Sequence, residues 1–256
     1  PEPYTADGPY PYREDDIRMI KNIAPKFIGR AIYRWGTESA FNDPDYLASA
    51  EKIIRELHDY DSDIIFQGCV FEYVSKEVET IRIPEWTFEA LDMPVENRTF
   101  RYDDMSDPSN PYFGLWGTAG LVPDITKTET RLWFMFLIGS YINIGCEAIH
   151  LGQTNLTGVA DADNSVWDSF LSCVRKYAFE NARRKWILLD SHCGPDDMMV
   201  GENNQFAKKY YQLENTLKAI KKPLVITEGK TDIKFIQKAK EVLGIDDVIF
   251  DVITPD

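Results

Sequence analysis

Residues 126–155, TKTETRLWFMFLIGSYINIGCEAIHLGQTN, decide the fold of the N-terminal part of this chain. Apolar side chains recur with helical spacing from Leu132 onward, which predicts a helix with a wide buried face over residues 126–141. Thr126 and Glu129 have the spacing of a capping box at the start of that helix. The apolar run EAIHL at 147–151 then predicts a buried strand, which ends at Gly152. One helix followed by one strand is the repeating unit of an α/β fold.

The same alternation continues on both sides of this stretch. Asp43 suits the N-cap and Pro44 the first position of a helix that precedes the second strand. Five further apolar runs predict strands: FIGRAIY at 27–33, IIFQGCV at 64–70, WILL at 186–189, PLVIT at 223–227 and VIFDVI at 248–253. Further helices are expected at 206–220 and 233–243. Strands that alternate with helices predict an α/β fold with a mainly parallel sheet.

Composition divides the chain into segments. Residues 1–200 hold 19 basic and 33 acidic residues, and residues 201–256 hold nine of each with neither Trp nor Arg. We therefore expect a polar extended arm at 1–19, a barrel-like α/β domain at 20–200 and a separate C-terminal α/β unit at 201–256. Residues 75–125 form a long segment rich in proline and aromatic residues, and loops of this length are usually functional or disordered. So many aromatic residues argue against disorder.

The net charge of −14 narrows the classes of partner. An acidic surface argues against a nucleic-acid footprint spread over the whole molecule, although it leaves a local site possible. It suits a neutral substrate such as a sugar. The chain contains no apolar run near the length of a membrane span, so no membrane partner is expected.

Polar and aromatic residues follow the first four predicted strands. In parallel α/β folds ligands bind at the carboxyl ends of the strands, so these side chains are expected to converge there. Two carboxylates at such a place, Glu72 and Asp190, serve as acid and base or as acid and nucleophile in glycoside hydrolysis. Trp35, Tyr73 and Trp116 would stack on sugar rings. The other candidates for substrate binding are Arg34, Glu38, Gln153, Asn155 and His192, whereas His58 and His150 are expected to be structural.

The stretches FIGRAIYRWGTES, IIFQGCVFEY, CEAIHLGQTNLTG and WILLDSH make residues 20–200 resemble a divergent TIM-barrel protein of the glycoside hydrolase type. In the large retaining clan of that type, the acid/base follows the fourth strand and the nucleophile the seventh. The resemblance implies that Asp190 is the acid/base, although the clan normally has Glu at that position. It leaves the nucleophile unassigned, implies no cofactor, and favours an extracytoplasmic protein acting on an oligosaccharide or glycan.

A second motif lies in KPLVITEGKTDIKFIQKA at 222–239. An apolar strand that ends in Glu-Gly-x-x-Asp and leads into an amphipathic helix resembles the first motif of the TOPRIM fold. That resemblance implies Glu228 as general acid/base or Mg²⁺ ligand in phosphoryl transfer, with Asp232 as a second metal ligand, since Mg²⁺ prefers oxygen ligands. The family's later Asp-x-Asp motif does not appear in these residues, so residues 203–256 correspond to the first half of a TOPRIM-like unit.

Three functional hypotheses follow. The leading one is a glycoside hydrolase that uses carboxylates at strand ends. The second is a Mg²⁺-dependent, cytoplasmic nuclease or phosphoryl-transfer protein that uses Glu228 and binds nucleic acid. The third is a sugar-binding protein without catalysis. If the fifth and sixth strands complete the same sheet as the first four, Glu228 becomes a candidate partner for Asp190 and the TOPRIM resemblance is coincidental.

Overall fold

The computed structural model of this protein describes residues 13–192, 224–226, 238 and 251–253. The chain divides into two compact units, Pro1–Cys193 and Gly194–Asp256. In the second unit, β5 (Leu224–Ile226) and β6 (Asp251–Ile253) pair in parallel. The helices expected at 206–220 and 233–243 lie outside the described residues, apart from the single residue Lys238.

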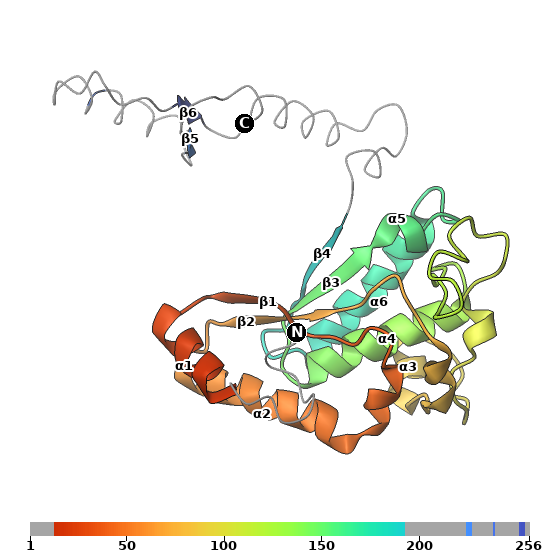
Figure 1. The fold of residues 1–256 in the computed structure, drawn as a ribbon, viewed down its shortest axis with the longest axis horizontal. Helices are drawn as coiled ribbons and strands as arrows, with labels where there is room; N and C mark the ends of the chain where they lie inside the picture. The colour runs from red at the N-terminus through yellow and green to blue at the C-terminus, as the bar shows by residue number, and fades with distance from the viewer. Residues whose placement is uncertain (1–12, 193–223, 227–237, 239–250, 254–256) are drawn as a thin grey trace. The chain divides into compact units, whose positions relative to one another are not determined.

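A four-stranded sheet organises the first unit (Figure 1). Its strands are β1 (Phe27–Ile32), β2 (Ile65–Cys69), β3 (Ala148–Gln153) and β4 (Leu188–His192). Every pairing is parallel and the strands lie in chain order. The predicted α/β class with parallel strands between helices is confirmed. Among the described strands the order never reverses, unlike in doubly wound sheets.

Helices occupy the connections between these strands. Asp43 caps α2 as predicted, since its side chain accepts a hydrogen bond from the Asp45 N–H at 2.9 Å. Residues 13–19 differ from expectation, because they belong to a helix and not to an extended arm. The α-helices are α1 (Arg13–Ile23), α2 (Pro44–Tyr60), α3 (Glu85–Ala90), α4 (Thr128–Asn143), α5 (Thr154–Thr157) and α6 (Ser165–Asn181), and the 3₁₀ helices are η1 (Glu38–Asn42), η2 (Lys76–Thr80) and η3 (Tyr102–Asp104).

The two faces of the sheet differ. Crossovers between parallel strands are right-handed, so successive connections that advance in one direction place their helices on the same face; Figure 1 shows α2 and α4 on one side. Ile28, Phe66 and Ile149 are buried on that helix-covered face. On the alternate face the edge-strand residues Phe27 and Leu188 are 45% and 46% exposed, whereas most side chains of the two middle strands are buried. We call the second face, to which Phe27 and Leu188 belong, the open face.

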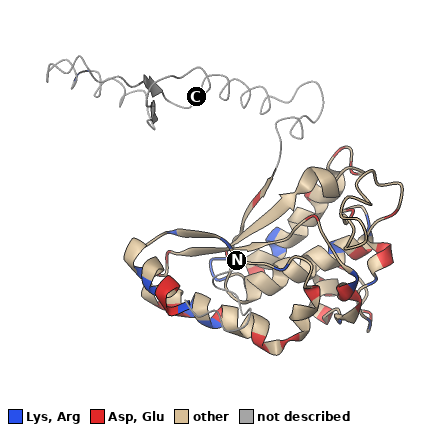
Figure 2. Ribbon diagram, in the orientation of Figure 1, with Lys and Arg blue, Asp and Glu red and all other residues tan. Residues whose placement is uncertain are grey.

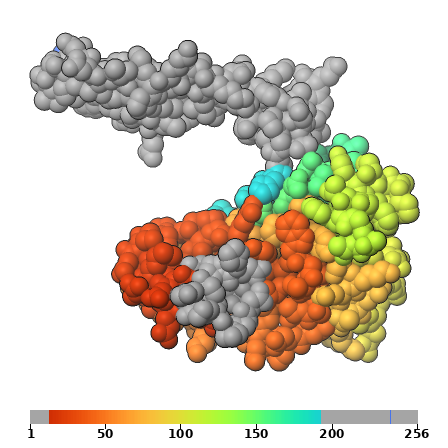
Figure 3. Space-filling model, in the orientation of Figure 1, coloured from red at the N-terminus to blue at the C-terminus, as the bar shows by residue number. Residues whose placement is uncertain are grey.

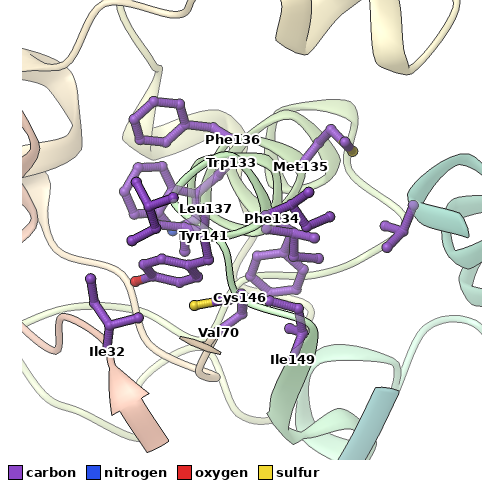
Figure 4. Close-up of a cluster of buried hydrophobic side chains, with 14 of the residues drawn as sticks. Ile32, Val70, Trp133, Phe134, Met135, Phe136, Leu137, Tyr141, Cys146 and Ile149 are labelled. Carbon is purple, nitrogen blue, oxygen red and sulfur yellow. The ribbon is translucent and has the colours of Figure 1, made fainter. Parts of the chain in front are cut away.

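Helix α4 is the centre of the core. Thirteen of its residues are buried, and its side chains lie beside Ile32 of β1, Val70 directly after β2 and Ile149 of β3 (Figure 4). On β2, a Cβ added at Gly68 would lie 2.6 Å from the ring of Tyr141. Glycine at this position therefore allows α4 to pack directly on the sheet, at a distance that any side chain would prevent.

The capping box predicted at the start of α4 is wrong. The helix begins at Thr128 after Lys127, which makes no side-chain cap. Glu129 instead accepts hydrogen bonds from Arg98 Nη1 at 2.8 Å and from the Arg101 N–H at 2.7 Å. A buried carboxylate gains more from a guanidinium and an amide than from a partly solvated helix end. The spacing of Thr126 and Glu129 matched the motif without forming it.

The aromatic segment 75–125 contributes mainly to the core. Phe88 and Phe100 are buried, and Phe100 meets Trp133 with ring centroids 5.1 Å apart. Trp86 packs against Phe136 and Tyr177. The yellow-green part of this segment reaches the molecular surface in Figure 3. Most of its aromatic residues thus pack in the core, and Trp116 is the one that joins the candidate site.

Charged residues are distributed over the helices and loops of the first unit (Figure 2). None of the helices in the described ranges is both long and apolar enough to span a membrane.

Candidate functional site

An aromatic cluster lies where β1 and β2 end. The indole of Trp35 stacks on Phe71 with centroids 5.3 Å apart, and it contacts Tyr73 at 6.0 Å and Trp116 at 5.5 Å. The ring of Tyr33 also meets that of Phe71, edge to face, with centroids 5.3 Å apart. Trp35 is 45% exposed, so a flat apolar surface is open to solvent. We call Tyr33, Trp35, Phe71, Tyr73 and Trp116 the aromatic platform.

Hydrogen bonds to the backbone hold the loop residues of this platform in place. Trp116 Nε1–H donates to the carbonyl of Glu72 at 3.1 Å. The Tyr73 hydroxyl donates to the carbonyl of Ala119 at 2.7 Å. Val74 and Leu121 pair as an isolated antiparallel bridge. These contacts attach the segment 112–121 to the end of β2, which explains how a residue so distant in sequence as Trp116 reaches Trp35.

Glu72 lies buried beside the platform. Its Oε2 accepts from the Gln153 N–H at 3.0 Å, and its Oε1 accepts from Gln153 Nε2 at 2.9 Å. Gly152, the residue before Gln153, has a positive φ of 58°, and a Cβ there would collide with Glu72 Oε2. Glycine therefore makes room for the carboxylate at the end of β3. The structure therefore brings together two of the predicted site residues, Glu72 and Gln153.

Other predicted residues have different surroundings. Glu38 is buried and accepts from Ser75 Oγ at 2.5 Å and from the Gly36 N–H at 3.3 Å, so it joins the loops that follow β1 and β2. The guanidinium of Arg34 lies over the ring of Tyr46 in α2, 4.0 Å from its centroid. Asn155 lies half-buried in α5. Glu38 and Arg34 thus support the loops around the site.

Asp190 lies on β4 at the open face, and its side chain is 58% exposed. Gln67 Nε2 donates to Asp190 Oδ1 at 2.6 Å, and His150 Nδ1 lies 3.1 Å from Oδ2. Because a carboxylate accepts hydrogen bonds, this contact places a proton on Nδ1 of His150. The Nε2 atom of His150 is buried without a partner among the described residues.

His192, two residues further on β4, contacts the opposite edge of the sheet. Arg30 Nη2 on β1 lies 2.7 Å from His192 Nε2. Because a guanidinium only donates, Nε2 must accept and the proton of the neutral ring is on Nδ1. Burial, His150 and Arg30 together lower the pKa of His192, while the negative charges of Glu72 and Asp190 oppose this shift. His192 is therefore a neutral acceptor at pH 7.

These four hydrogen bonds and one ring contact link side chains from all four strands in a ring. The Arg30 N–H donates to Gln67 Oε1 at 3.1 Å, and Gln67 holds Asp190. Asp190 bonds to His150, whose ring meets the ring of His192 with centroids 4.5 Å apart. His192 returns to Arg30. We call Arg30, Gln67, His150, Asp190 and His192 the cross-sheet network.

Three members of this network were not among the predicted site residues. His150 was expected to be structural, yet it bonds to Asp190. Arg30 and Gln67 were not selected, because the prediction rested on the residues that follow each strand. The signal was available in the strands themselves: each of these polar residues interrupts an apolar run. A polar side chain within a buried strand needs a partner.

The second predicted site falls on residues without a described structure. Glu228 and Asp232 lie outside the described residues, so their proposed Mg²⁺ site remains a prediction. Within the described part of the chain, no group of three or more His, Cys, Asp and Glu side chains is arranged to hold a metal ion.

Comparisons with protein-family models, with curated proteins and with solved structures found no match to this chain. Fold and site define its class directly. The first unit is an α/β protein whose parallel strands lie in chain order, with an aromatic platform and Glu72 after the ends of β1 and β2. Asp190 was expected to follow its strand but lies in the middle of β4.

Proposed function

We propose that this protein is a carbohydrate-active barrel protein, a glycoside hydrolase that acts on an oligosaccharide. One observation carries the proposal. Two carboxylates, Glu72 after the end of β2 and Asp190 in the middle of β4, lie on one parallel sheet, and the loops that follow β1 and β2 add a platform with an exposed indole. Aromatic faces stack on the apolar faces of sugar rings, and paired carboxylates perform glycoside hydrolysis.

The two carboxyl groups have different surroundings, which suits a division of roles. In glycoside hydrolysis one carboxylic acid protonates the departing glycosidic oxygen, and the other carboxylate attacks the sugar or activates water. Asp190 is the more exposed and projects from the open face, so we assign it the direct contact with the glycosidic oxygen. Glu72, next to the platform, is assigned as its partner.

The barrel is part of the proposal. A closed barrel of this class needs eight parallel strands in chain order, and its interior is lined by the residues that alternate with the helix-facing ones. The four strands β1 to β4 have that order, and Phe27 and Leu188 supply apolar residues on the open face. We propose that the open face corresponds to the interior of such a barrel.

A specific observation favours sugar binding without catalysis as a second candidate. All four carboxylate oxygens of Glu72 and Asp190 already accept hydrogen bonds from protein donors. An acid that protonates a leaving group must release such a contact first. A protein that only binds sugar has no such requirement.

Hydrolysis and binding are separated by one set of measurements. We expect a panel of oligosaccharides to raise the melting temperature, since a ligand of the folded state stabilises it by mass action. Asp190→Asn and Glu72→Gln should each abolish hydrolysis but retain binding. Trp35→Ala should weaken binding about tenfold, equivalent to ~1.4 kcal/mol. Trp186→Ala, which removes an exposed indole two residues before β4, should leave binding unchanged.

Each outcome has a consequence. Binding without hydrolysis would select the second candidate. A chain that binds no sugar, or one whose sugar binding survives Trp35→Ala unchanged, would overturn the proposal.

A further inference from the structure

Arg30 has an unusual backbone for its place in the fold. It lies within β1 yet has a φ of 51°, in the left-handed region that favours glycine. The register between β1 and β2 shifts between Ile28 and Ile32, which marks a bulge. Non-glycine residues keep such a conformation only where the surroundings impose it, and these places concentrate at functional sites. Bulges next to sites redirect a side chain.

The bulge directs Arg30 to the open face. Side chains two residues apart in a regular strand share a face, so Arg30 would then lie on the same face as Ile28. Ile28 is buried toward the helices. Instead the Arg30 N–H reaches Gln67 Oε1 at 3.1 Å and its exposed side chain reaches His192 at 2.7 Å. The strained backbone thus places a guanidinium among the cross-sheet network.

Arg30 has no counter-charge within the described residues. Elsewhere in the same unit arginines pair with buried carboxylates, as Arg98 does with Glu129 and Arg183 with Glu147. The nearest acidic member of the network, Asp190, is held by Gln67 and His150. The polar side-chain partner of Arg30 is therefore the ring nitrogen of His192, a neutral acceptor.

From this arrangement we infer that Arg30 recognises a carboxylate on the substrate, so the oligosaccharide contains uronic acid. The inference rests on the proposed function and specifies its substrate class. A guanidinium binds a carboxylate through two parallel N–H donors, and one of its edges is sufficient for this. With Nε2 of His192 accepting from Arg30, the Nδ1–H of the same ring supplies a further donor. A C6 carboxylate would take the place of the missing counter-charge.

The carboxylates of the site do not prevent this binding. Those of Asp190 and Glu72 already accept N–H donors from Gln67, His150 and Gln153, which offsets part of their charge. A neutral sugar offers only hydroxyl groups to Arg30, and these leave its charge without a partner when water is displaced. The site therefore distinguishes a uronic acid from the corresponding neutral sugar through Arg30.

The test compares two ligands that differ only at C6. Tri-galacturonate and its carboxyl-reduced counterpart are titrated calorimetrically into the full chain. We expect the acidic trimer to bind at least about tenfold more tightly, which corresponds to one charge-assisted contact. Arg30→Gln should abolish this preference, and Arg30→Lys should restore it only in part because lysine lacks the planar fork. Arg55→Gln, at an exposed pair with Glu51 in α2, is the matched control.

Arg30→Gly is the control for folding, because glycine accepts the positive φ and keeps the backbone N–H. We expect this variant to be at least as stable as the parent chain and to lose the preference. Equal or tighter binding of the neutral trimer would overturn the inference and leave the proposed function intact, as would a preference that survives Arg30→Gln. If neither trimer nor any other sugar binds, the proposed function fails together with this inference.

Discussion

Arg30 on β1 and His192 on β4 meet at 2.7 Å although two strands lie between them. Neighbouring strands are about 4.8 Å apart, so side chains from the first and fourth strands of a flat sheet would project side by side without contact. The long side chain of Arg30 therefore extends across the open face to reach His192. Gln67 and Asp190 connect the strands in the same direction, so the cross-sheet network joins all four strands.

Gln67 is the residue through which this network is most easily broken. Gln67→Met preserves the approximate shape of the side chain but removes the acceptor of the Arg30 N–H and the donor to Asp190. We expect the free energy of unfolding to fall by about 1–3 kcal/mol, because the Arg30 N–H and the Asp190 carboxylate each lose a partly buried hydrogen-bond partner. Urea denaturation measures this, with the exposed Asn97→Ala as control. Equal stabilities would contradict the role of Gln67.

Gly152 makes room for Glu72. Gly152→Ala forces an alanine into a φ of 58° and drives its Cβ against the carboxylate. The backbone conformation alone costs about 1–2 kcal/mol, and the carboxylate must move as well, so stability and sugar binding should both fall.

Gly114→Ala provides the matched comparison, since a Cβ there meets no atom within 4 Å. Its melting temperature should equal that of the parent chain. If Gly152→Ala behaved like Gly114→Ala in thermal unfolding and in sugar titration, the close approach of Gly152 to Glu72 would be refuted.

Two histidines make stability depend on pH. Burial lowers the pKa of His58 below its ordinary value of 6.5, with Arg183 acting in the same direction, and the pKa of His192 is lowered by burial, His150 and Arg30. As the pH falls below 6.5 the unfolded chain takes up protons first. The stability present above that value is therefore lost as the pH falls through the lowered pKa values.

The measurement is a set of urea midpoints between about pH 7.5 and pH 5.5. The midpoint should fall with pH in the parent chain and fall less in the double variant His58→Gln, His192→Gln. A proton NMR titration of the Arg30→Gln variant adds a local check, because removal of the positive charge should raise the pKa of His192. If the pKa of His192 did not change in this variant, the positive charge of Arg30 would not act on His192.

The stability of a Glu129 variant distinguishes a buried ion pair from the predicted capping box. Arg98 donates to both carboxylate oxygens of Glu129, at 2.8 and 2.9 Å, and the Arg101 N–H adds a third hydrogen bond. Removing one partner of a buried pair costs about 3–5 kcal/mol, whereas loss of a cap costs about 1 kcal/mol. Glu129→Ala should therefore destabilise the chain by the larger amount in denaturant titrations, and a loss near the smaller value would favour the cap.

The alternation of helices and strands could be predicted from the sequence because apolar periodicity reports burial directly. The runs at 27–33, 64–70 and 147–151 each coincide with an observed strand, and β4 begins two residues after the predicted start at Trp186. Local spacing was a weaker guide to hydrogen bonds. Thr126 and Glu129 satisfied the pattern of a cap, but the tertiary partner Arg98 lay 31 residues away from Glu129.

The site could be predicted only in part, because the sequence indicates where strands end but not which distant residues meet. Residues directly after a strand, such as Glu72 and Gln153, are recognisable as strand ends, and the structure brings these two together. Arg30 is recognisable as a polar residue within the apolar run FIGRAIY, but its orientation depends on a bulge that this run does not indicate. The contact between His150 and Asp190 could not be predicted locally, because the two residues are 40 positions apart in the sequence.

The chain order of the strands has a consequence for how the protein is made. Each strand of the four pairs with the one synthesised just before it, so the sheet can grow by one strand at a time as the chain leaves the ribosome. Arg30 and Gln67 come into contact early, whereas Asp190 and His192 arrive on the last strand. The chemistry of the site is therefore completed only when the sheet itself is complete.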